Sequence, residues 1–283
     1  MPEGRQPFTI SALFKITRFW NLVIIVMAQL FTAFFLISKN TLFIWQLYVL
    51  SLSTTLIAAA GYIINDYYDV KIDLINKPDR VVVGKSMRRR YALFFHWSLS
   101  IAGVALGFLL SWKIGVINFV CGFLLWWYSN LLKRLPFAGN FVVALLTGLS
   151  VYVVAVLFDP RNQNILLYSF FSFFITLVRE IIKDIEDLKG DHTFGCQTLP
   201  IVWGIRKTKS FIYLLIVFHL LAIVYFNSLF MGLEVWMLAL FIFLPISFLV
   251  LRLSTADTVK EFSTLSLYCK LILVIGVFSM VMI

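Results

Sequence analysis

Long runs without a charged side chain dominate this sequence, and each approaches the roughly 20 residues that an α-helix needs to cross a lipid bilayer. Six of these runs lie in the first two thirds of the chain: Phe19–Ser38, Asn40–Asn65, Tyr91–Trp112, Ile114–Leu132, Leu135–Phe158 and Asn162–Val178. Charged residues make up only 13% of the chain, against about 25% in a soluble domain. Together these features exclude a soluble fold.

Three further spans are expected after residue 209. Ser210–Leu251 is interrupted only by Glu234, so it is predicted to hold two spans with a turn between them. The residues that favour this turn are Asn227, Ser228 and Gly232. The last span covers about Leu265–Ile283, with the Lys270 ammonium reaching the interface. The sequence therefore predicts an all-α integral membrane protein, a bundle of nine transmembrane helices that forms one domain over residues 1–283.

The basic residues are distributed unevenly between the two sides of these spans. Of the 24 Lys and Arg, 21 fall at the N-terminus or beside the loops after spans two, four, six and eight. Because cytoplasmic loops carry an excess of Lys and Arg, the N-terminus is predicted to be cytoplasmic and the C-terminus outside. The loops after spans two and six are expected to form a cytoplasmic cap. The net charge of +10 then reports topology and attraction to anionic membrane lipids. It is poor evidence for a nucleic acid partner, and no obligate protein partner is inferred.

Two acidic clusters with the same spacing, DxxDxxxD, follow the second and the sixth span. The clusters are Asp66, Asp69 and Asp73, and, each 118 positions on, Asp184, Asp187 and Asp191. Four spans separate them, so both are expected on the cytoplasmic side. If helix continues through each cluster, its three carboxylates share one helix face. Carboxylates at this density repel one another unless a cation lies between them.

The ligands that these clusters offer suit Mg²⁺, which binds through a few carboxylates together with substrate phosphates. Six Asp can hold two or three such ions, and the ions can hold a diphosphate. Basic side chains suited to the same anion lie nearby: Lys77, Arg80, Lys133, Arg134, Arg179 and Lys183. The aromatic side chains of the neighbouring spans can stabilise an allylic carbocation: Tyr67, Tyr68, Trp126, Trp127 and Tyr128. This pattern predicts an active site for an isoprenoid diphosphate.

Two segments resemble the paired signatures of the UbiA-type intramembrane prenyltransferases. Residues 65–80 read NDYYDVKIDLINKPDR, which resembles the first signature, NDxxDxxxD followed by NKPxR. Residues 179–191 read REIIKDIEDLKGD, which resembles the second. The resemblance extends to Arg18, Asn21, Tyr128–Phe137 and Gly139–Asn140, so it covers essentially the whole chain. One departure is Val81–Val83, which stands where the family often has Pro and Ser.

The resemblance implies a bundle of nine spans, a Mg²⁺ cofactor, and transfer of a prenyl group from its diphosphate to a lipophilic acceptor. It assigns the Mg²⁺–diphosphate site to Asn65, Asp66, Asp69, Asp73, Asp184, Asp187 and Asp191, and direct phosphate contacts to Arg80 and Lys133. Further candidates for substrate binding are Arg18, Asn21, Lys77, Tyr128, Arg179 and Lys183. Two alternatives stay open: Arg18 and Asn21 can merely anchor the first span, and Lys77 and Lys183 can merely pair with neighbouring Asp.

The acceptor is the least constrained part of this prediction. The second signature most resembles the branch of the family that alkylates the hydroxyl of geranylgeranylglyceryl phosphate in ether-lipid synthesis. The alternative is an aromatic acceptor of quinone biosynthesis, such as 4-hydroxybenzoate or dihydroxynaphthoate. An acceptor phosphate would need basic contacts of its own, for which Arg179, Lys183 and Lys85 are available.

Two other functions are disfavoured by the pattern. A secondary transporter would carry its acids near the middle of broken spans, whereas these acids lie at span ends. A CDP-alcohol phosphotransferase would need a DG…AR…G…D…D block, which is absent from the sequence. His96 and His219 lie inside spans, where interhelical hydrogen bonds are expected.

Overall fold

The computed structural model describes residues 10–231 and 235–282, and every regular element in this part of the chain is a helix. Between these residues the only β-type contact is an isolated bridge from Val83 to Met87. Seven helices of the described chain are long and apolar enough to cross a membrane. The predicted all-α, multi-pass membrane protein is confirmed to this extent.

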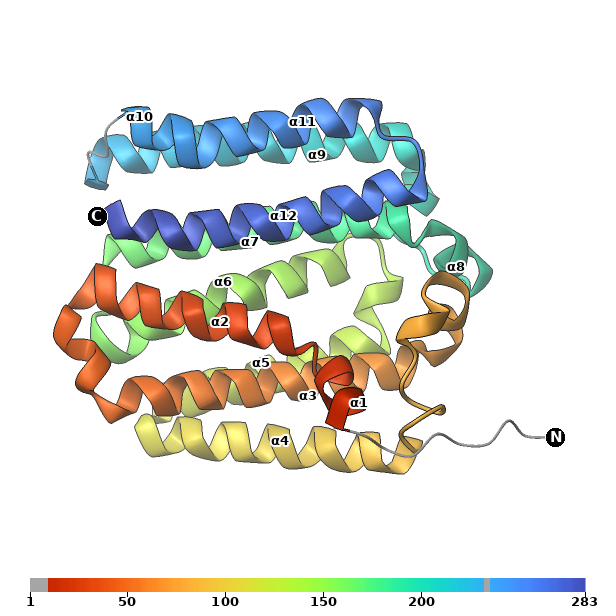
Figure 1. The fold of residues 1–283 in the computed structure, drawn as a ribbon, viewed down its shortest axis with the longest axis horizontal. Coiled ribbons are helices and arrows are strands. Elements are labelled where there is room, and N and C mark those ends of the chain that lie inside the picture. Colours follow the sequence, from red (N-terminus) through yellow and green to blue (C-terminus); the bar gives the residue numbers. More distant parts are fainter. Residues whose placement is uncertain (1–9, 232–234, 283) are drawn as a thin grey trace. The chain divides into compact units, whose positions relative to one another are not determined.

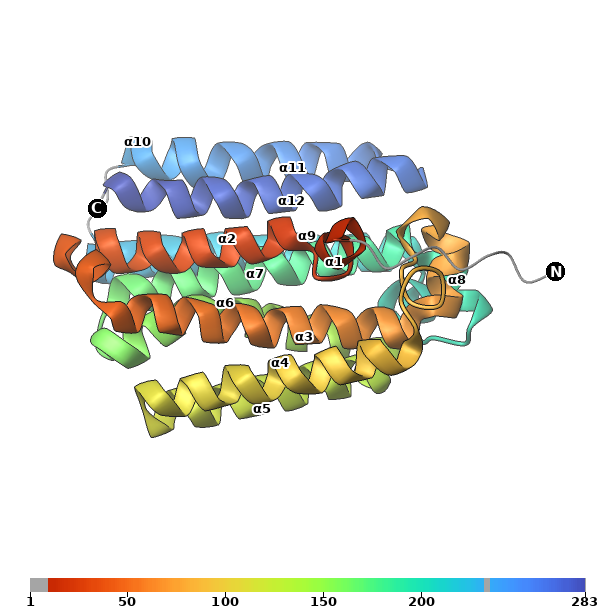
Figure 2. The same ribbon diagram turned by 60° about the horizontal axis from the view of Figure 1, so that its bottom comes forward.

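The chain folds as two compact units, and the first comprises Met1–Val26 and Trp45–Lys133. Its main elements are α1 (Ile10–Ile16), the start of α2 (Phe19–Phe31), α3 (Trp45–Asn76), η3 (Pro78–Arg80), α4 (Arg89–Leu110) and α5 (Trp112–Asn130). The unit ends at Lys133, within the short helix η4 (Leu132–Arg134). Helices α3, α4 and α5 pack side by side in both ribbon views (Figures 1 and 2).

Small residues let these three helices approach closely. A Cβ added to Gly103 of α4 would lie 2.8 Å from the Ile57 side chain of α3, so a larger residue does not fit there without rearrangement. Polar side chains complete the contact. His96 Nδ1 lies 3.0 Å from the Ala60 carbonyl oxygen, and Asn118 Nδ2 donates to the Gly103 carbonyl oxygen at 3.0 Å. The interhelical hydrogen bond expected of His96 is therefore confirmed.

A small apolar cluster fastens the loop after α3 to the N-terminal helix. Ile16 of α1 is fully buried against Val82, Val83 and Met87. Lys15, also on α1, donates a hydrogen bond to the Asp79 carbonyl oxygen. The valines that depart from the family pattern thus have a packing role in this chain, because they bind α1 to the loop. We call the apolar set Ile16, Val82, Val83 and Met87 the α1 clamp.

The second unit comprises Met27–Ile44 and Arg134–Ile283. After the end of α2 it contains η1 (Thr32–Ile37), η2 (Lys39–Phe43), α6 (Ala138–Phe158), α7 (Gln163–Glu186), α8 (Leu188–Thr193), α9 (Leu199–Phe226), η5 (Asn227–Met231), α10 (Val235–Leu238), η6 (Ala239–Phe243), α11 (Leu244–Thr255), α12 (Val259–Ser279) and η7 (Met280–Met282). Helix α7 is the most buried candidate span and packs against α6, α9 and α12. Its last turn carries Asp184, the first carboxylate of the second acidic cluster.

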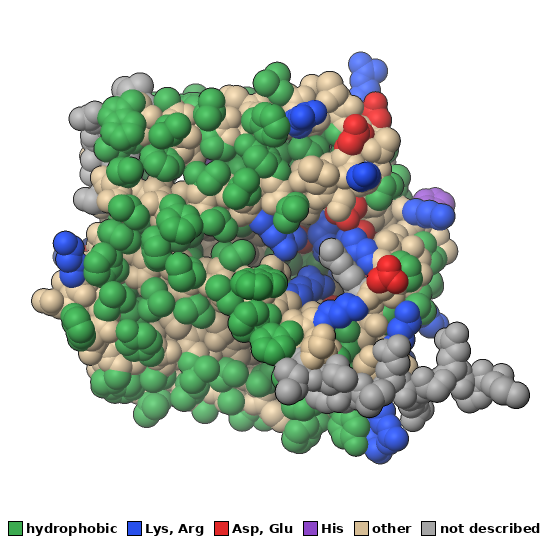
Figure 3. Space-filling model, viewed as in Figure 1, with side chains coloured by type: hydrophobic (Ala, Val, Ile, Leu, Met, Phe, Trp, Pro, Cys, Tyr) green, Lys and Arg blue, Asp and Glu red, His purple; other side chains and the backbone are tan. Residues whose placement is uncertain are grey.

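The surface of the second unit is apolar along its helices. In the upper part of Figure 3, where α9, α11 and α12 lie, hydrophobic side chains cover the length of the helices, and charged side chains gather at one end. At that end Lys209 Nζ lies 3.5 Å from Asp257 Oδ1. This separation of apolar flank and charged end is that of a helix bundle in a bilayer.

Some predicted boundaries were wrong. The last helix begins at Val259 and not near Leu265, because Thr258 and Glu261 form a capping box at its start. The turn expected at Asn227 and Ser228 is instead a π-helical continuation of α9 through Met231, whereas Gly232 and Glu234 lie outside the described residues.

Two of the nine expected spans are not among the seven. One is α5, and the other is the short apolar stretch Ala239–Thr255. A count of nine spans, and the cytoplasmic cap, stay predictions.

Candidate functional site

The first acidic motif lies on a single uninterrupted helix. Helix α3 runs for 32 residues and ends at Asn76, immediately before the segment that contains Pro78. Asp66, Asp69 and Asp73 therefore lie in its last three turns, and the expectation that helix continues through Asp73 is confirmed. Lys77 closes the helix, with its backbone N–H donating to the Asp73 carbonyl oxygen at 2.8 Å.

Two basic side chains contact carboxylates of this motif. Lys133 Nζ, in the short helix after α5, lies 2.5 Å from Asp69 Oδ1, and both side chains are largely buried. Arg18 Nη2, in the linker between α1 and α2, lies 3.2 Å from Asp66 Oδ1. Arg18 adopts a left-handed backbone conformation with φ of 51°, which is uncommon for a residue with a side chain. The structure thus pairs Arg18 with Asp66 and Lys133 with Asp69.

Tyr62 of α3 completes the surroundings of Arg18. The Arg18 guanidinium carbon lies 4.9 Å from the centre of the Tyr62 ring, and Asn21 Nδ2 donates to the Tyr62 hydroxyl at 3.2 Å. Burial by itself would lower the pKa of Arg18, but the negative charge of Asp66, with smaller contributions from Tyr62 and Tyr128, raises it. Arg18 and Asn21 are therefore tied to the motif as well as to the start of α2. Tyr62 was missed in the sequence, although its position one turn before Asp66 is a usable signal.

The remaining residues of the first motif divide into two groups. Tyr68 faces the Lys133 ammonium, 6.0 Å from its ring centre. Tyr67 instead packs against the α1 clamp, and the Arg89 guanidinium lies over its ring at 4.9 Å. Lys85 Nζ donates to the Pro78 carbonyl oxygen at 3.0 Å, so this side chain supports the loop. Arg80 lies in η3, and its side chain is outside the described part of the structure.

The second motif does not lie on one continuous helix, contrary to expectation. Helix α7 ends at Glu186, Asp187 forms the junction with φ of −89° and ψ of 5°, and Asp191 lies in the short helix α8. The Asp191 backbone N–H donates to the Asp187 carbonyl oxygen at 3.2 Å, so a backbone hydrogen bond joins α8 to the junction. No Pro or Gly stands at the junction itself.

Asp184 has a partner that the motif search did not include. Asn140 Nδ2, in the first turn of α6, donates to Asp184 Oδ2 at 2.8 Å. Helix α6 begins after Phe137, whose φ of 64° turns the chain sharply. Asn140 lies in the Gly139–Asn140 segment of the resemblance, which was the only sequence signal for it.

The other candidates of the second motif lie beside Asp184 along α7. Arg179 Nη1 forms an ion pair with Glu180 Oε1, so at least part of this guanidinium is engaged by its neighbour. Lys183 is the basic residue in the last turn of α7, next to Asp184. The loop after α8 is closed by two backbone hydrogen bonds, from Cys196 N–H to the Asp191 carbonyl oxygen at 3.0 Å and from Gln197 N–H to the Arg134 carbonyl oxygen at 2.8 Å.

The residues of both motifs fit a hard cation such as Mg²⁺. Among the described residues, no three His, Cys, Asp or Glu side chains lie close enough together to hold a metal ion by themselves. Such a cage is not needed, because Mg²⁺ is usually bound by one or two carboxylates plus phosphates and water. Asn65 Oδ1, at the head of the first motif, is buried and accepts no hydrogen bond from the described residues. An oxygen acceptor in this state matches the donor chemistry of a Mg²⁺–diphosphate site.

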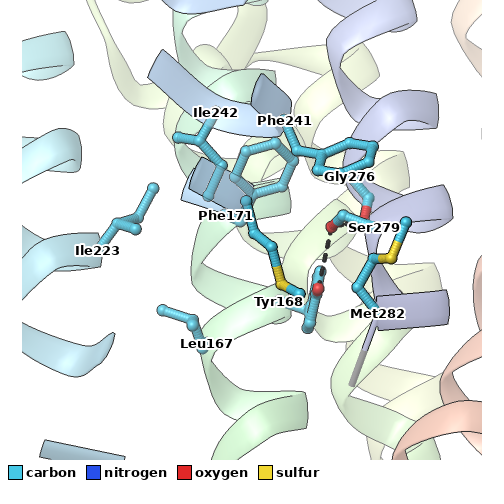
Figure 4. Close-up of a pocket in the computed structure, with 10 residues that line it drawn as sticks. Leu167, Tyr168, Phe171, Ile223, Phe241, Ile242, Gly276, Ser279 and Met282 are labelled. Carbon is cyan, nitrogen blue, oxygen red and sulfur yellow. Dashed lines mark hydrogen bonds between the residues drawn. The ribbon is translucent and has the colours of Figure 1, made fainter. Parts of the chain in front are cut away.

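A pocket of different character lies in the second unit. Figure 4 shows it between the N-terminal part of α7, the end of α9 and the end of α12, with Phe171 and Ile242 on its wall. Its polar feature is the pair of hydroxyl groups of Tyr168 and Ser279, 2.9 Å apart. Residue 168 lies 16 positions before Asp184 on α7, roughly 24 Å along the helix axis. An apolar pocket at that distance does not offer the ligands of a metal or a diphosphate.

Comparisons with known proteins identify what this chain resembles. A model of the UbiA prenyltransferase family matches residues 25–271. Over 224 residues the chain is 34% identical to a digeranylgeranylglyceryl phosphate synthase of Saccharolobus solfataricus, in an alignment that covers 78% of this chain and 79% of that protein.

Two solved structures share the fold. One, a digeranylgeranylglyceryl phosphate synthase in membranes, aligns with a TM-score of 0.73 and 23% identity and covers 96% of this chain and 97% of that one. The other, a UbiA homolog from Archaeoglobus fulgidus bound to GPP and Mg²⁺, aligns with a TM-score of 0.69 and 14% identity and covers 96% and 100% of the two chains.

Proposed function

The chain belongs to the UbiA prenyltransferase family, and from that premise we propose that it joins a geranylgeranyl group to the hydroxyl of geranylgeranylglyceryl phosphate, with Mg²⁺ as cofactor. In this reaction the bond between C1 of the prenyl group and the diphosphate oxygen breaks. A new bond forms between C1 and the acceptor oxygen, and the hydroxyl proton is released. The product is a diether lipid phosphate, and the leaving group is diphosphate.

The observation that carries the proposal is the pairing of motif carboxylates with cations in the first unit. Lys133 contacts Asp69, and Arg18 contacts Asp66, so cationic groups for a diphosphate stand beside the carboxylates for a metal. A binding site for a metal-bound diphosphate needs both kinds of group within a few ångströms. The same proximity favours this function over a transporter, in which acids and bases pair near the middle of the membrane.

Each group of residues has a role in the proposed site. The metal ligands are Asn65, Asp66, Asp69, Asp73, Asp184, Asp187 and Asp191. When bound, Mg²⁺ would neutralise the charge that develops on the departing diphosphate. Lys133, Arg18 and Arg80 would donate hydrogen bonds to phosphate oxygens, with Lys77, Lys183 and Arg179 as further cations. Asn21 would hold the Tyr62–Arg18 pair in place, and Tyr68 and Tyr128 would shield the reacting carbon from water.

The proposed enzyme uses residues 1–283 as one catalytic domain with nine spans. Its N-terminus is cytoplasmic, its C-terminus is outside, and the loops after the second and sixth spans cap an active site on the cytoplasmic side. The positive-inside distribution of Lys and Arg supports this orientation. Substrate and product are then both amphipathic lipids of one leaflet, with phosphate groups at the height of the acidic motifs.

The choice of acceptor rests on the named relative and not on the site. The Saccharolobus solfataricus protein is named for digeranylgeranylglyceryl phosphate synthesis, and the chain covers 79% of it at 34% identity. An aromatic acceptor of quinone biosynthesis is the second candidate, because the acidic motifs handle the diphosphate donor whichever acceptor follows.

Two alanine substitutions test the metal-binding role. We expect Asp69→Ala and Asp187→Ala each to reduce prenyl transfer by at least about 100-fold, because removing a group that stabilises the transition-state charge typically costs that much. The control is Asp257→Ala, since Asp257 is mostly exposed and pairs with Lys209 far from the motifs in sequence. The measurement is radiolabelled geranylgeranyl transfer with Mg²⁺ present. Full activity of both variants would contradict the assignment.

The acceptor needs a separate experiment. Purified protein is incubated with geranylgeranyl diphosphate, Mg²⁺ and one acceptor at a time: geranylgeranylglyceryl phosphate, 4-hydroxybenzoate or dihydroxynaphthoate. We expect a diether product from the first alone, identified by mass spectrometry. Product on an aromatic ring alone would keep the prenyltransferase reaction and overturn the choice of acceptor.

A further inference from the structure

The geometry points to a positioning residue that the motifs do not contain. We propose that Asn140 holds the Asp184 carboxylate in the orientation that binds the metal, an inference that rests on the proposed function of Asp184 as a ligand. The amide donates to one carboxylate oxygen, Oδ2, at 2.8 Å, and so restricts the rotation of the carboxylate group.

The contact between Asn140 and Asp184 depends on the close packing of α6 against α7. Asn140 lies in the first turn of α6 and is only 7% exposed, whereas Asp184 lies in the last turn of α7. Asn140, Ala144 and Gly148 are spaced by four residues, so they lie along one face of α6. Ala144 is fully buried, and a Cβ on Gly148 would come within 2.9 Å of the Ser169 carbonyl oxygen of α7. These small residues bring the two helices together and place the amide against the carboxylate.

An amide suits this role better than a basic side chain. Asn is neutral, so it orients the carboxylate without neutralising the charge that attracts a cation. Partners of this kind around a metal ligand typically contribute 10- to 100-fold in metal affinity or activity. Lys133, by contrast, brings a full positive charge to Asp69.

The other buried Asn of the described chain, Asn118, shows what a purely structural role looks like. Asn118 Nδ2 donates to the Gly103 carbonyl oxygen and to Ser53 Oγ. This amide joins helices through neutral groups. Asn140 is bonded instead to a carboxylate of the acidic motif, which gives it a consequence beyond packing.

The test measures metal binding directly. Mn²⁺, used as a probe for Mg²⁺, is titrated into detergent-solubilised protein with inorganic pyrophosphate present, and free Mn²⁺ is followed by electron paramagnetic resonance. We expect Asn140→Leu, which keeps the volume and removes the donor, to weaken Mn²⁺ binding by about 10- to 100-fold. In the transfer assay the KM for Mg²⁺ should rise by a similar factor, while kcat at saturating Mg²⁺ changes little.

Three further variants make the result decisive. Asn140→Ala tests the same donor without a bulky replacement, in case Asn140→Leu fails to fold. Asn118→Leu is the matched control, expected to lower thermal stability without changing Mn²⁺ affinity. A folded Asn140 variant with the Mn²⁺ affinity of the original protein overturns the inference. Asp184→Ala separates this failure from that of the proposed function: if it too retains Mn²⁺ binding, Asp184 is not a ligand.

Discussion

The two acidic motifs have one spacing, but the structure gives their carboxylates different partners. In the first motif Asp66 and Asp69 each contact a cation, Arg18 and Lys133. In the second motif Asp184 accepts a hydrogen bond from a neutral amide. The same sequence pattern therefore has two outcomes. In the first motif two carboxylates are paired with positive charges, whereas in the second the Asn140 amide orients Asp184 without bringing a charge to it.

The backbone of the two motifs also differs, in whether the helix is continuous. The first motif occupies one continuous helix, so its three Asp have a fixed relation to one another. In the second motif the helix is interrupted at Asp187, and the last carboxylate, that of Asp191, lies in α8. The loop after the first motif is fastened by the apolar α1 clamp, and the loop after the second by backbone hydrogen bonds. The two motifs therefore differ in side-chain partners, in backbone continuity and in the contacts that hold the loops after them.

Among the following substitutions, Lys133→Gln is expected to weaken pyrophosphate binding most. The ammonium both competes with a metal for Asp69 and offers a hydrogen bond to phosphate. Losing a charged hydrogen bond of about 1.5–3 kcal/mol should weaken pyrophosphate binding by roughly 10- to 100-fold. Mn²⁺ affinity without pyrophosphate should rise, because the competing cation is gone. Titrations of Mn²⁺ with and without pyrophosphate measure both quantities.

Arg134→Gln provides the control for Lys133→Gln. It removes the same charge one residue further on, and the contact of residue 134 with Gln197 uses only its backbone carbonyl oxygen. A general electrostatic effect would move both variants alike. Equal Mn²⁺ affinities in the two variants would mean that Lys133 does not compete for Asp69, and the comparison between the motifs would lose its basis.

A smaller loss of pyrophosphate binding is expected from Arg18→Gln. The Arg18 side chain is 35% exposed, and its contact with Asp66 is longer than that of Lys133 with Asp69. Partly exposed ion pairs contribute at most about 1 kcal/mol, so pyrophosphate binding should weaken by no more than about fivefold. Arg90→Gln, which removes an equal charge from an exposed side chain, should leave binding unchanged. A loss as large as that of Lys133→Gln would show that the linker of α1 and α2 is a principal part of the site.

Much of this arrangement was predictable from the sequence because it depends on local pattern. The apolar runs predicted the helices, and α3 carries all of the first motif before it ends ahead of Pro78, a residue that breaks helices. Gly84 and Gly195, in the loops after the two motifs, each have a positive φ, which glycine adopts readily. Such features need only the order of residues along one segment.

The rest depends on contacts between distant segments. Asn140 reaches Asp184 across 44 positions, through the packing of α6 on α7. The left-handed conformation of Arg18 and the junction at Asp187 have no local cause in Gly or Pro, so no local pattern indicates them. His219 was expected to form an interhelical hydrogen bond, but within the described chain its Nε2 has no partner and its ring lies against Phe171 and Phe174. Packing against aromatic rings replaces the hydrogen bond there.

The smallest effect on activity is expected from loosening the α1 clamp with Ile16→Ala. Burial of Ile16 is complete, and truncating such a side chain typically costs about 2–5 kcal/mol. Because the clamp holds only the first loop, hydrogen exchange should accelerate at the amides of Val82–Met87 and stay unchanged at Cys196 and Gln197. The control is Leu13→Ala on the exposed side of α1, where Leu13 is 37% exposed. Equal acceleration in both loops would show that they open as one unit, and the two motifs would then differ in side-chain partners alone.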